Sequence, residues 1–145
     1  MRISIKIAIY HNLASGGNKR ELYEFSKRLK KDGNIIYLYG NLKEEGQYLD
    51  LSKFVDEVLI YHFKKIKYIS FTLPYLKSIL NLLISFYNIF NLIKISKKMA
   101  KNIDRENFDY VFIHQSKDYV QAPFLINFLK TRSIFFCAEP QRTIY

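Results

Sequence analysis

Several residue types are scarce in this chain of 145 residues, and each scarcity excludes a class of protein. The single cysteine, Cys137, excludes a disulfide framework, and without a Cys/His cluster no metal site is predicted. Five glycines and three prolines, against 49% hydrophobic residues, exclude a disordered or collagenous chain. The length predicts one domain, 1–145, with a substantial core. The single thiol fits a reducing, cytoplasmic setting.

Long uncharged hydrophobic runs are also missing. Arg2 and Lys6 interrupt the apolar start of the chain, so no secretion signal is predicted. The longest run without charge, 78–93, has 16 residues and includes several asparagines and serines. A bilayer span needs about 20 apolar residues, so this run is not predicted to cross a membrane.

Acidic residues are absent from 64–101, which carries eight lysines of a chain with net charge +10. An excess of this kind predicts an anionic partner. The same stretch contains an apolar helix expected to start near Pro74, whose uncharged polar positions recur at helical spacing. These positions are Ser78, Asn81, Ser85, Asn88 and Asn91. Two interpretations are open: the helix rests on an anionic membrane surface, or it packs on a sheet and against a neighbouring domain.

The N-terminal third predicts a strand, a glycine turn, a helix and a second strand. Hydrophobic residues alternate over 3–9, and Asn18 and Glu21 are expected to form the cap of a helix that stops at Gly33. A second strand over 35–39 closes a parallel strand–helix–strand unit. Further strands are expected over 54–61, 109–114 and 133–138, with a short helix over 120–129. The predicted fold class is therefore α/β, a Rossmann-like parallel sheet flanked by helices.

Ligands of open parallel sheets bind at the carboxyl ends of the strands, so candidate site residues are sought there. Gly16 and Gly17 would let backbone approach a ligand, and the helix that follows offers free N–H groups to an anion, with Lys19 and Arg20 beside them. Neither a G-x-G-x-x-G nor a phosphate-loop lysine motif occurs, so no cofactor is predicted. A purely structural turn fits the two glycines equally well.

Two other strand ends carry polar residues. His114 closes an apolar strand and is a candidate catalytic base or charge stabiliser; the alternative is a histidine hydrogen-bonded to the next loop. Glu139 and Arg142 follow the last strand, where they would line a site or pair with each other at the surface. Cys137 is expected to be inert core.

The order of these pieces resembles the N-terminal domain of GT-B glycosyltransferases, most closely the retaining family-four group. The resemblance rests on 7–22, with its Gly-Gly turn before a basic helix start, on 108–114, a strand closing on histidine, on 121–125, and on the Glu139-Pro140 exit. It implies transfer of a sugar from a nucleotide-sugar donor to a glycan or lipid-linked acceptor, as in cell-surface polysaccharide synthesis.

The resemblance also implies roles for residues and partners. Gly16, Gly17 and Arg20 would approach the donor phosphates, and His114 would lie near the reacting sugar. The donor-binding C-terminal domain, with glutamates eight positions apart, has no counterpart in this sequence, so the chain alone is expected to be inactive.

Alternatives to a half-transferase remain. One is a non-catalytic partner subunit that recruits an acceptor or a membrane to a separate catalytic half, and another is a phosphate- or nucleic-acid-binding module suggested by charge alone. Nucleic acid is not expected, since most aromatic residues fall in core-like strands and helices. The expected location is cytoplasmic and peripheral at the inner face of the membrane.

Overall fold

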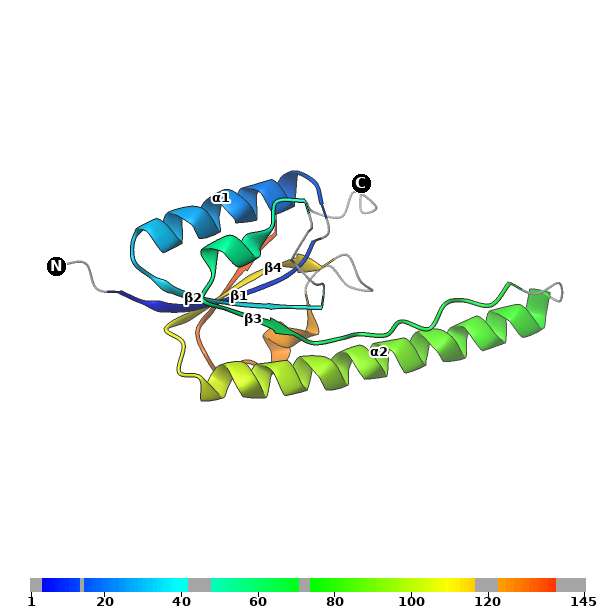
Figure 1. Cartoon of the computed structure of the whole chain (residues 1–145). Coiled ribbons are helices and arrows are strands. Elements are labelled where there is room, and N and C mark those ends of the chain that lie inside the picture. Colours follow the sequence, from blue (N-terminus) through cyan, green and yellow to red (C-terminus); the bar gives the residue numbers. More distant parts are fainter. Residues whose placement is uncertain (1–3, 14, 42–47, 71–73, 117–122, 138–145) are drawn as a thin grey trace.

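A five-stranded parallel sheet with the strand order β3-β2-β1-β4-β5 forms the centre of the molecule (Figure 1). This computed structural model describes residues 4–13, 15–41, 48–70, 74–116 and 123–137. The strands are β1 (Lys6–Asn12), β2 (Ile35–Gly40), β3 (Glu57–Ile60), β4 (Tyr110–Ser116) and β5 (Ser133–Phe136). All four strand pairs are parallel, so the carboxyl ends share one edge. The predicted α/β class, a Rossmann-like parallel sheet flanked by helices, is confirmed.

Helix α1 (Gly17–Lys31) covers one face of the sheet. Successive strand residues point to opposite faces, so Ile7 and Ile9 turn toward α1 while Ala8 and Tyr10 turn away. The cluster under α1 consists of Ile7, Ile9, Leu13, Leu22, Ile36, Leu38 and Leu51. The helix ends as predicted before Gly33, which has a φ of 84° that favours glycine.

The opposite face packs against the end of α2 (Pro74–Arg105) and a 3₁₀ turn, η2 (Phe124–Phe128). Its cluster contains Ala8, Tyr10, Tyr39, Met99, Ala100, Ile103, Phe108, Val111, Ile113 and Leu125. The Asp104 carboxylate accepts hydrogen bonds from the backbone N–H groups of Lys130 and Thr131 at 3.1 and 2.9 Å. These bonds tie the end of α2 to the turn that leads into β5.

Helix α2 is longer than the sheet is wide and projects far beyond it (Figure 1). Its 32 residues span about 48 Å at 1.5 Å per residue. We call 92–105 the inner half, which packs on the sheet, and 75–90 the outer half, which extends past it. An extended segment, 62–70, runs beside the outer half and is called the arm. The helix predicted to start near Pro74 is confirmed.

Three local predictions need correction. The strand expected over 54–61 is shortened to β3, because a 3₁₀ turn, η1 (Leu51–Phe54), ends where it was to begin. The described part of the helix expected over 120–129 is the single 3₁₀ turn η2. Cys137 lies beyond the end of β5 and is exposed, so its assignment to the core was wrong.

Candidate functional site

The turn between β1 and α1 brings two glycines to the carboxyl edge of the sheet. Gly16 is the N-cap of α1 with a φ of 103°, a conformation that favours glycine, and its carbonyl accepts the Arg20 N–H at 3.2 Å. No side chain caps the helix, so the predicted cap by Asn18 and Glu21 is wrong. Open space adjoins the Cα atoms of both Gly16 and Gly17. The chain therefore leaves room at this turn, as a close backbone approach would require.

The two basic residues of the first turn of α1 point in different directions. Lys19 is fully buried, whereas Arg20 is exposed. Successive helix residues are about 100° apart, so neighbours in sequence do not share a face. The structure therefore separates the two cations that were predicted to act together.

His114 lies on the α1 side of β4 and is 1% exposed. Neither of its ring nitrogens has a hydrogen-bond partner among the described residues. Burial lowers the pKa of His114 to about 4, and the neighbouring His11 contributes, while the Gln115 backbone weakly opposes the shift. His114 is thus a neutral imidazole near pH 7, with one N–H donor and one acceptor nitrogen.

His11 ends the adjacent strand and is also buried, at 2% exposure. Its Nδ1 accepts a hydrogen bond from the Leu13 N–H at 3.2 Å, which places the proton of the neutral ring on Nε2. The strand register is irregular here, since a bulge interrupts the pairing of β1 with β4 after Tyr10. The two histidines close neighbouring strands at the edge where ligands of parallel sheets bind.

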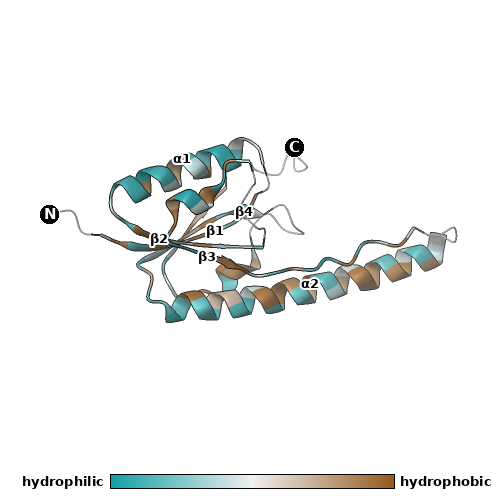
Figure 2. Ribbon diagram, in the orientation of Figure 1, coloured by the Kyte–Doolittle hydropathy of each residue, from teal (hydrophilic) through white to brown (hydrophobic). Residues whose placement is uncertain are grey.

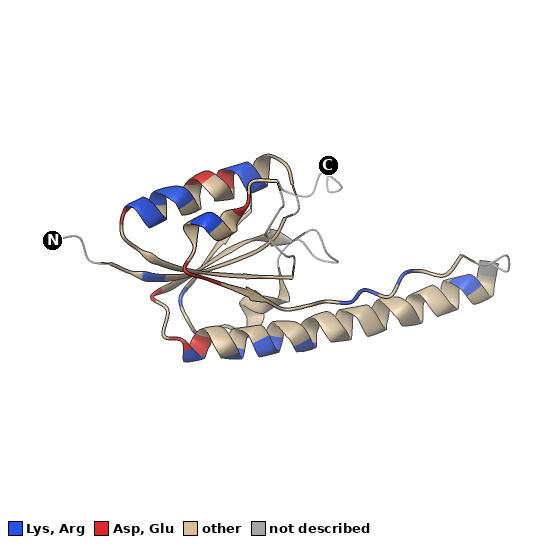
Figure 3. Ribbon diagram, in the orientation of Figure 1, with Lys and Arg blue, Asp and Glu red and all other residues tan. Residues whose placement is uncertain are grey.

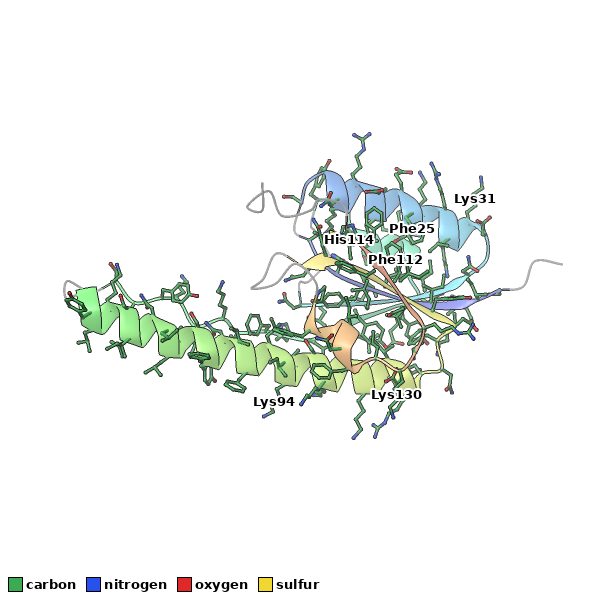
Figure 4. All side chains as sticks on the ribbon, turned by 180° about the vertical axis from the view of Figure 1, so that it is seen from behind. Phe25, Lys31, Lys94, Phe112, His114 and Lys130 are labelled. Carbon is green, nitrogen blue, oxygen red and sulfur yellow. The ribbon has the colours of Figure 1, made fainter. Side chains whose placement is uncertain are left out.

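An apolar cavity of about 170 Å³ adjoins His114. Its wall, which we call the His114 pocket, is formed by Glu21, Leu22, Phe25, Phe112, His114 and Phe136. Figure 4 shows His114, Phe25 and Phe112 close together between α1 and the sheet. A larger and more open groove of about 550 Å³ lies between β3 and α2, at Tyr61 and Lys98. We regard the smaller cavity as the better candidate site, because it contains the buried histidine.

The second notable feature is the way the arm is held on α2. The side-chain amide of Asn88 accepts the Ile66 N–H and donates to the Ile66 carbonyl, both at 2.9 Å. Asn81 does the same for Ile69, at 2.9 and 3.3 Å. Seven helical residues and three extended residues both span about 10 Å, so the two asparagines match the spacing of the arm. The predicted uncharged stripe is therefore the docking surface of the arm.

We call the arm and the outer half of α2 together the finger. Opposite the arm, its helix presents a continuous row of large apolar side chains, which are 45–87% exposed. They are Tyr75, Leu76, Ile79, Leu82, Leu83, Phe86, Tyr87 and Phe90. Their separations of three and four residues place them on one face. Figure 2 shows these hydrophobic positions along the projecting part of α2.

The exposed row continues into the inner half with a different chemistry. Lys94, Lys97 and Lys101 follow Phe90 at separations of four, three and four residues, and all three are exposed. Figure 3 shows lysines along this part of α2 and on the arm, with no acidic residue on the finger. The outward side of α2 is thus apolar over the finger and basic beside the sheet.

By length and composition, 75–105 is the one helix in the described residues that is apolar enough to cross a membrane. Only 11% of its most apolar stretch is buried in the molecule. A core helix passes the same test but is mostly buried, which this helix is not.

The structure brings some predicted site residues together and leaves others apart. His114 and the first turns of α1 meet at the His114 pocket, whereas Arg20 faces solvent. Glu139 and Arg142 lie outside the described residues, and their assignment stays a prediction. Phe25, Phe112 and Phe136 were missed as wall residues, although Phe112 and His114, two apart on one strand, had to share a face.

Comparison with known proteins supports the fold alone. No protein-family model matches the sequence, and no curated protein matches it significantly. Two structures of the C-terminal domain of PF1911 hydrogenase from Pyrococcus furiosus are similar to the chain. One is 15% identical, covers 94% of this chain and 95% of that chain, and has a TM-score of 0.57; the other is 17% identical, with 90% of each and 0.53.

A universal stress protein from Archaeoglobus fulgidus is similar at 10% identity and a TM-score of 0.44, over 92% of this chain and 93% of that chain. Identities this low transfer no activity, and the last score is too low for further argument. These similarities show a five-stranded α/β fold with the order observed here.

The interpretation of the chain as the N-terminal domain of a GT-B glycosyltransferase was wrong. Its structural neighbours are a hydrogenase C-terminal domain and a universal stress protein, not glycosyltransferases. The motifs that suggested it, a Gly-Gly turn after the first strand and a strand ending in His114, belong to the common start of a parallel sheet. The transferase activity, its role in polysaccharide synthesis and the partner-subunit alternative are withdrawn with it.

Proposed function

We propose that this chain is a peripheral membrane-binding domain, which docks on an anionic lipid surface through the finger. The observation that carries the proposal is the exposed apolar row of α2, which continues into exposed lysines. Soluble proteins rarely expose contiguous apolar patches larger than a few hundred Å², and a larger patch marks an interaction site. A helix with an apolar face and flanking lysines is suited to the boundary between lipid headgroups and acyl chains.

The charge of the finger favours lipid over a second copy of the chain. The stretch 64–101 carries eight lysines and no acidic residue, so two fingers packed together would repel each other. Each lysine near an anionic leaflet contributes about 1 kcal/mol of attraction. Tyr75, Tyr87 and the phenylalanines of the row are the amphipathic and apolar rings that an interface accommodates. The proposed location is therefore the anionic inner face of a membrane.

Peripheral docking fits the finger better than a transmembrane arrangement. The arm is extended and belongs to no helix or sheet, and the asparagine clamps engage the backbone of Ile66 and Ile69. A single extended strand cannot satisfy all of its backbone groups in hydrocarbon, so the arm must stay in contact with water or headgroups. The helix then lies along the surface with the arm on its upper side.

Co-sedimentation with liposomes tests the proposal. We expect binding to vesicles of phosphatidylcholine with 30% phosphatidylserine, weaker binding to phosphatidylcholine alone, and a decrease between about 0.05 and 0.5 M salt, because the lysine term is screened. The double variant L83S/F86S removes two exposed apolar side chains of the row and is expected to lose at least tenfold in affinity. The matched control I134S removes an exposed apolar side chain from β5, 52% exposed, and is expected to bind normally.

Charge is tested in the same assay. K94E/K101E is expected to weaken binding to anionic vesicles, whereas K31E, on the exposed surface of α1, changes the net charge without touching the row. Three outcomes would contradict the proposal: no binding to any vesicle, equal loss in the control variants, or binding that resists extraction by alkaline carbonate. A concentration-dependent doubling of mass by light scattering, abolished by L83S/F86S and without lipid binding, would assign the row to a second copy instead.

A further inference from the structure

The His114 pocket is built from three elements and is separate from the finger. β4 supplies Phe112 and His114 on one face, and His114 lies opposite Phe136 of β5 in the strand register. Phe25 of α1 closes the side, with its ring centroid 4.7 Å from that of Phe112. The Phe112 and Phe136 rings stack with centroids 6.0 Å apart. Three phenylalanine rings and one imidazole thus surround a largely apolar space (Figure 4).

His114 is the exceptional residue of this wall. Its side chain is 99% buried, and both ring nitrogens lack a partner among the described residues. Buried polar groups are hydrogen-bonded in native proteins, and an unpaired one is unfavourable enough to need a reason. The imidazole is neutral near pH 7, so it offers one donor and one acceptor but no charge. A ligand that bonds to either nitrogen would remove this defect.

The size and polarity of the cavity define that ligand. Apolar cavities of about 150 Å³ lined by aliphatic and aromatic side chains bind benzene, and this cavity measures about 170 Å³. We propose that the His114 pocket binds a small neutral aromatic molecule carrying one hydroxyl or ring N–H, which stacks among the phenylalanines and hydrogen-bonds to His114. The carboxylate of Glu21, also in the wall, disfavours an anionic ligand.

Phenol and toluene form a matched pair of probes, because they differ by a hydroxyl in place of a methyl group. Titration of the full chain at pH 7, followed by amide chemical shifts, is expected to show phenol binding about tenfold more tightly than toluene. Shifts should concentrate at Phe112, His114 and Phe136. H114F is expected to abolish the preference for phenol while retaining toluene, and H62F, at an exposed histidine, to keep it.

A second variant keeps the proposal testable if H114F does not fold. F25W adds ring volume to the cavity and is expected to prevent binding of both probes. The proposal is overturned if neither probe binds the unaltered chain, if H114F keeps the preference for phenol, or if F25W binds both probes as before. Tetramethylammonium serves as a further arm: binding of this cation in place of phenol would show an aromatic cation site and would overturn the proposal as well. Lipid binding through the finger is unaffected by any of these outcomes.

Discussion

The two halves of α2 present opposite chemistry to the rest of the protein. In the inner half, Met99 and Ile103 are buried on the sheet and the lysines face solvent. In the outer half, Asn81 and Asn88 face the arm, and apolar residues such as Phe90, 69% exposed, face solvent. The helix is straight in pattern throughout, so what changes along it is the partner. An apolar sheet selects one side of the inner half, and the polar backbone of an extended strand selects the same side of the outer half.

This difference shows that one amphipathic helix can reverse its polarity without interruption. A stripe of asparagines and serines normally marks the solvent side of a helix. Here that stripe faces protein, because an extended segment carries unsatisfied N–H and C=O groups that side-chain amides can bond. The apolar side of the outer half is consequently left outside, where it supports the proposed contact with lipid.

The largest test of the comparison uses the same substitution in each half. Ile103 is fully buried, whereas Ile79 is 57% exposed. We expect I103A to lower the free energy of unfolding by about 3 kcal/mol through lost burial and the cavity left behind. I79A should stay within about 0.5 kcal/mol, because it removes no packed side chain. Urea denaturation measures both, and equal losses would show that the outer half packs against the protein in solution.

The same contrast explains which parts of the fold could be predicted. Alternation over 3–9 and the stop at Gly33 are local signals, and the strand–helix–strand start they predicted is confirmed. The stripe on α2 was visible, but its partner was not, because the arm, 62–70, has no periodicity of its own. Only the match between seven helical and three extended residues, at Asn81 and Asn88, could have indicated it.

The candidate site was predictable to the same extent. The position of His114 at a strand end followed from the pattern of β4, but its pairing opposite Phe136 depends on the register of β5, which no local signal fixes. The split between buried Lys19 and exposed Arg20 depends on where α1 begins, and the misplaced cap hid it. The family resemblance failed for a related reason, because short motifs at the start of a parallel sheet reflect the fold rather than the chemistry.

A second test compares the buried polar groups of the two regions, which are paired in the finger and unpaired at His114. The folded-state pKa of His114 is about 4, below its ordinary value of 6.5, so the unfolded chain binds the extra proton between these pH values. Stability is therefore lost as pH falls from about 6.5 to 4, by roughly 2–3 kcal/mol from this residue. H114F is expected to lose less stability than the unaltered chain over this window in urea denaturation. Parallel pH curves for the two proteins would mean that His114 is not buried as a neutral ring.

The smallest expected effect concerns the clamp that holds the arm. Asn88 is fully buried and bonds both backbone groups of Ile66, so N88A should release this part of the arm and speed amide exchange at Ile66 about tenfold. N91A is the matched control: it makes the same change three residues along the stripe, at a half-buried side chain. Alanine favours helix by about 0.5 kcal/mol over asparagine at both sites, so the difference between the variants isolates the clamp. Equal exchange at Ile66 in both would show that the arm is held by other contacts, and that the stripe does not select the side of α2 that faces the protein.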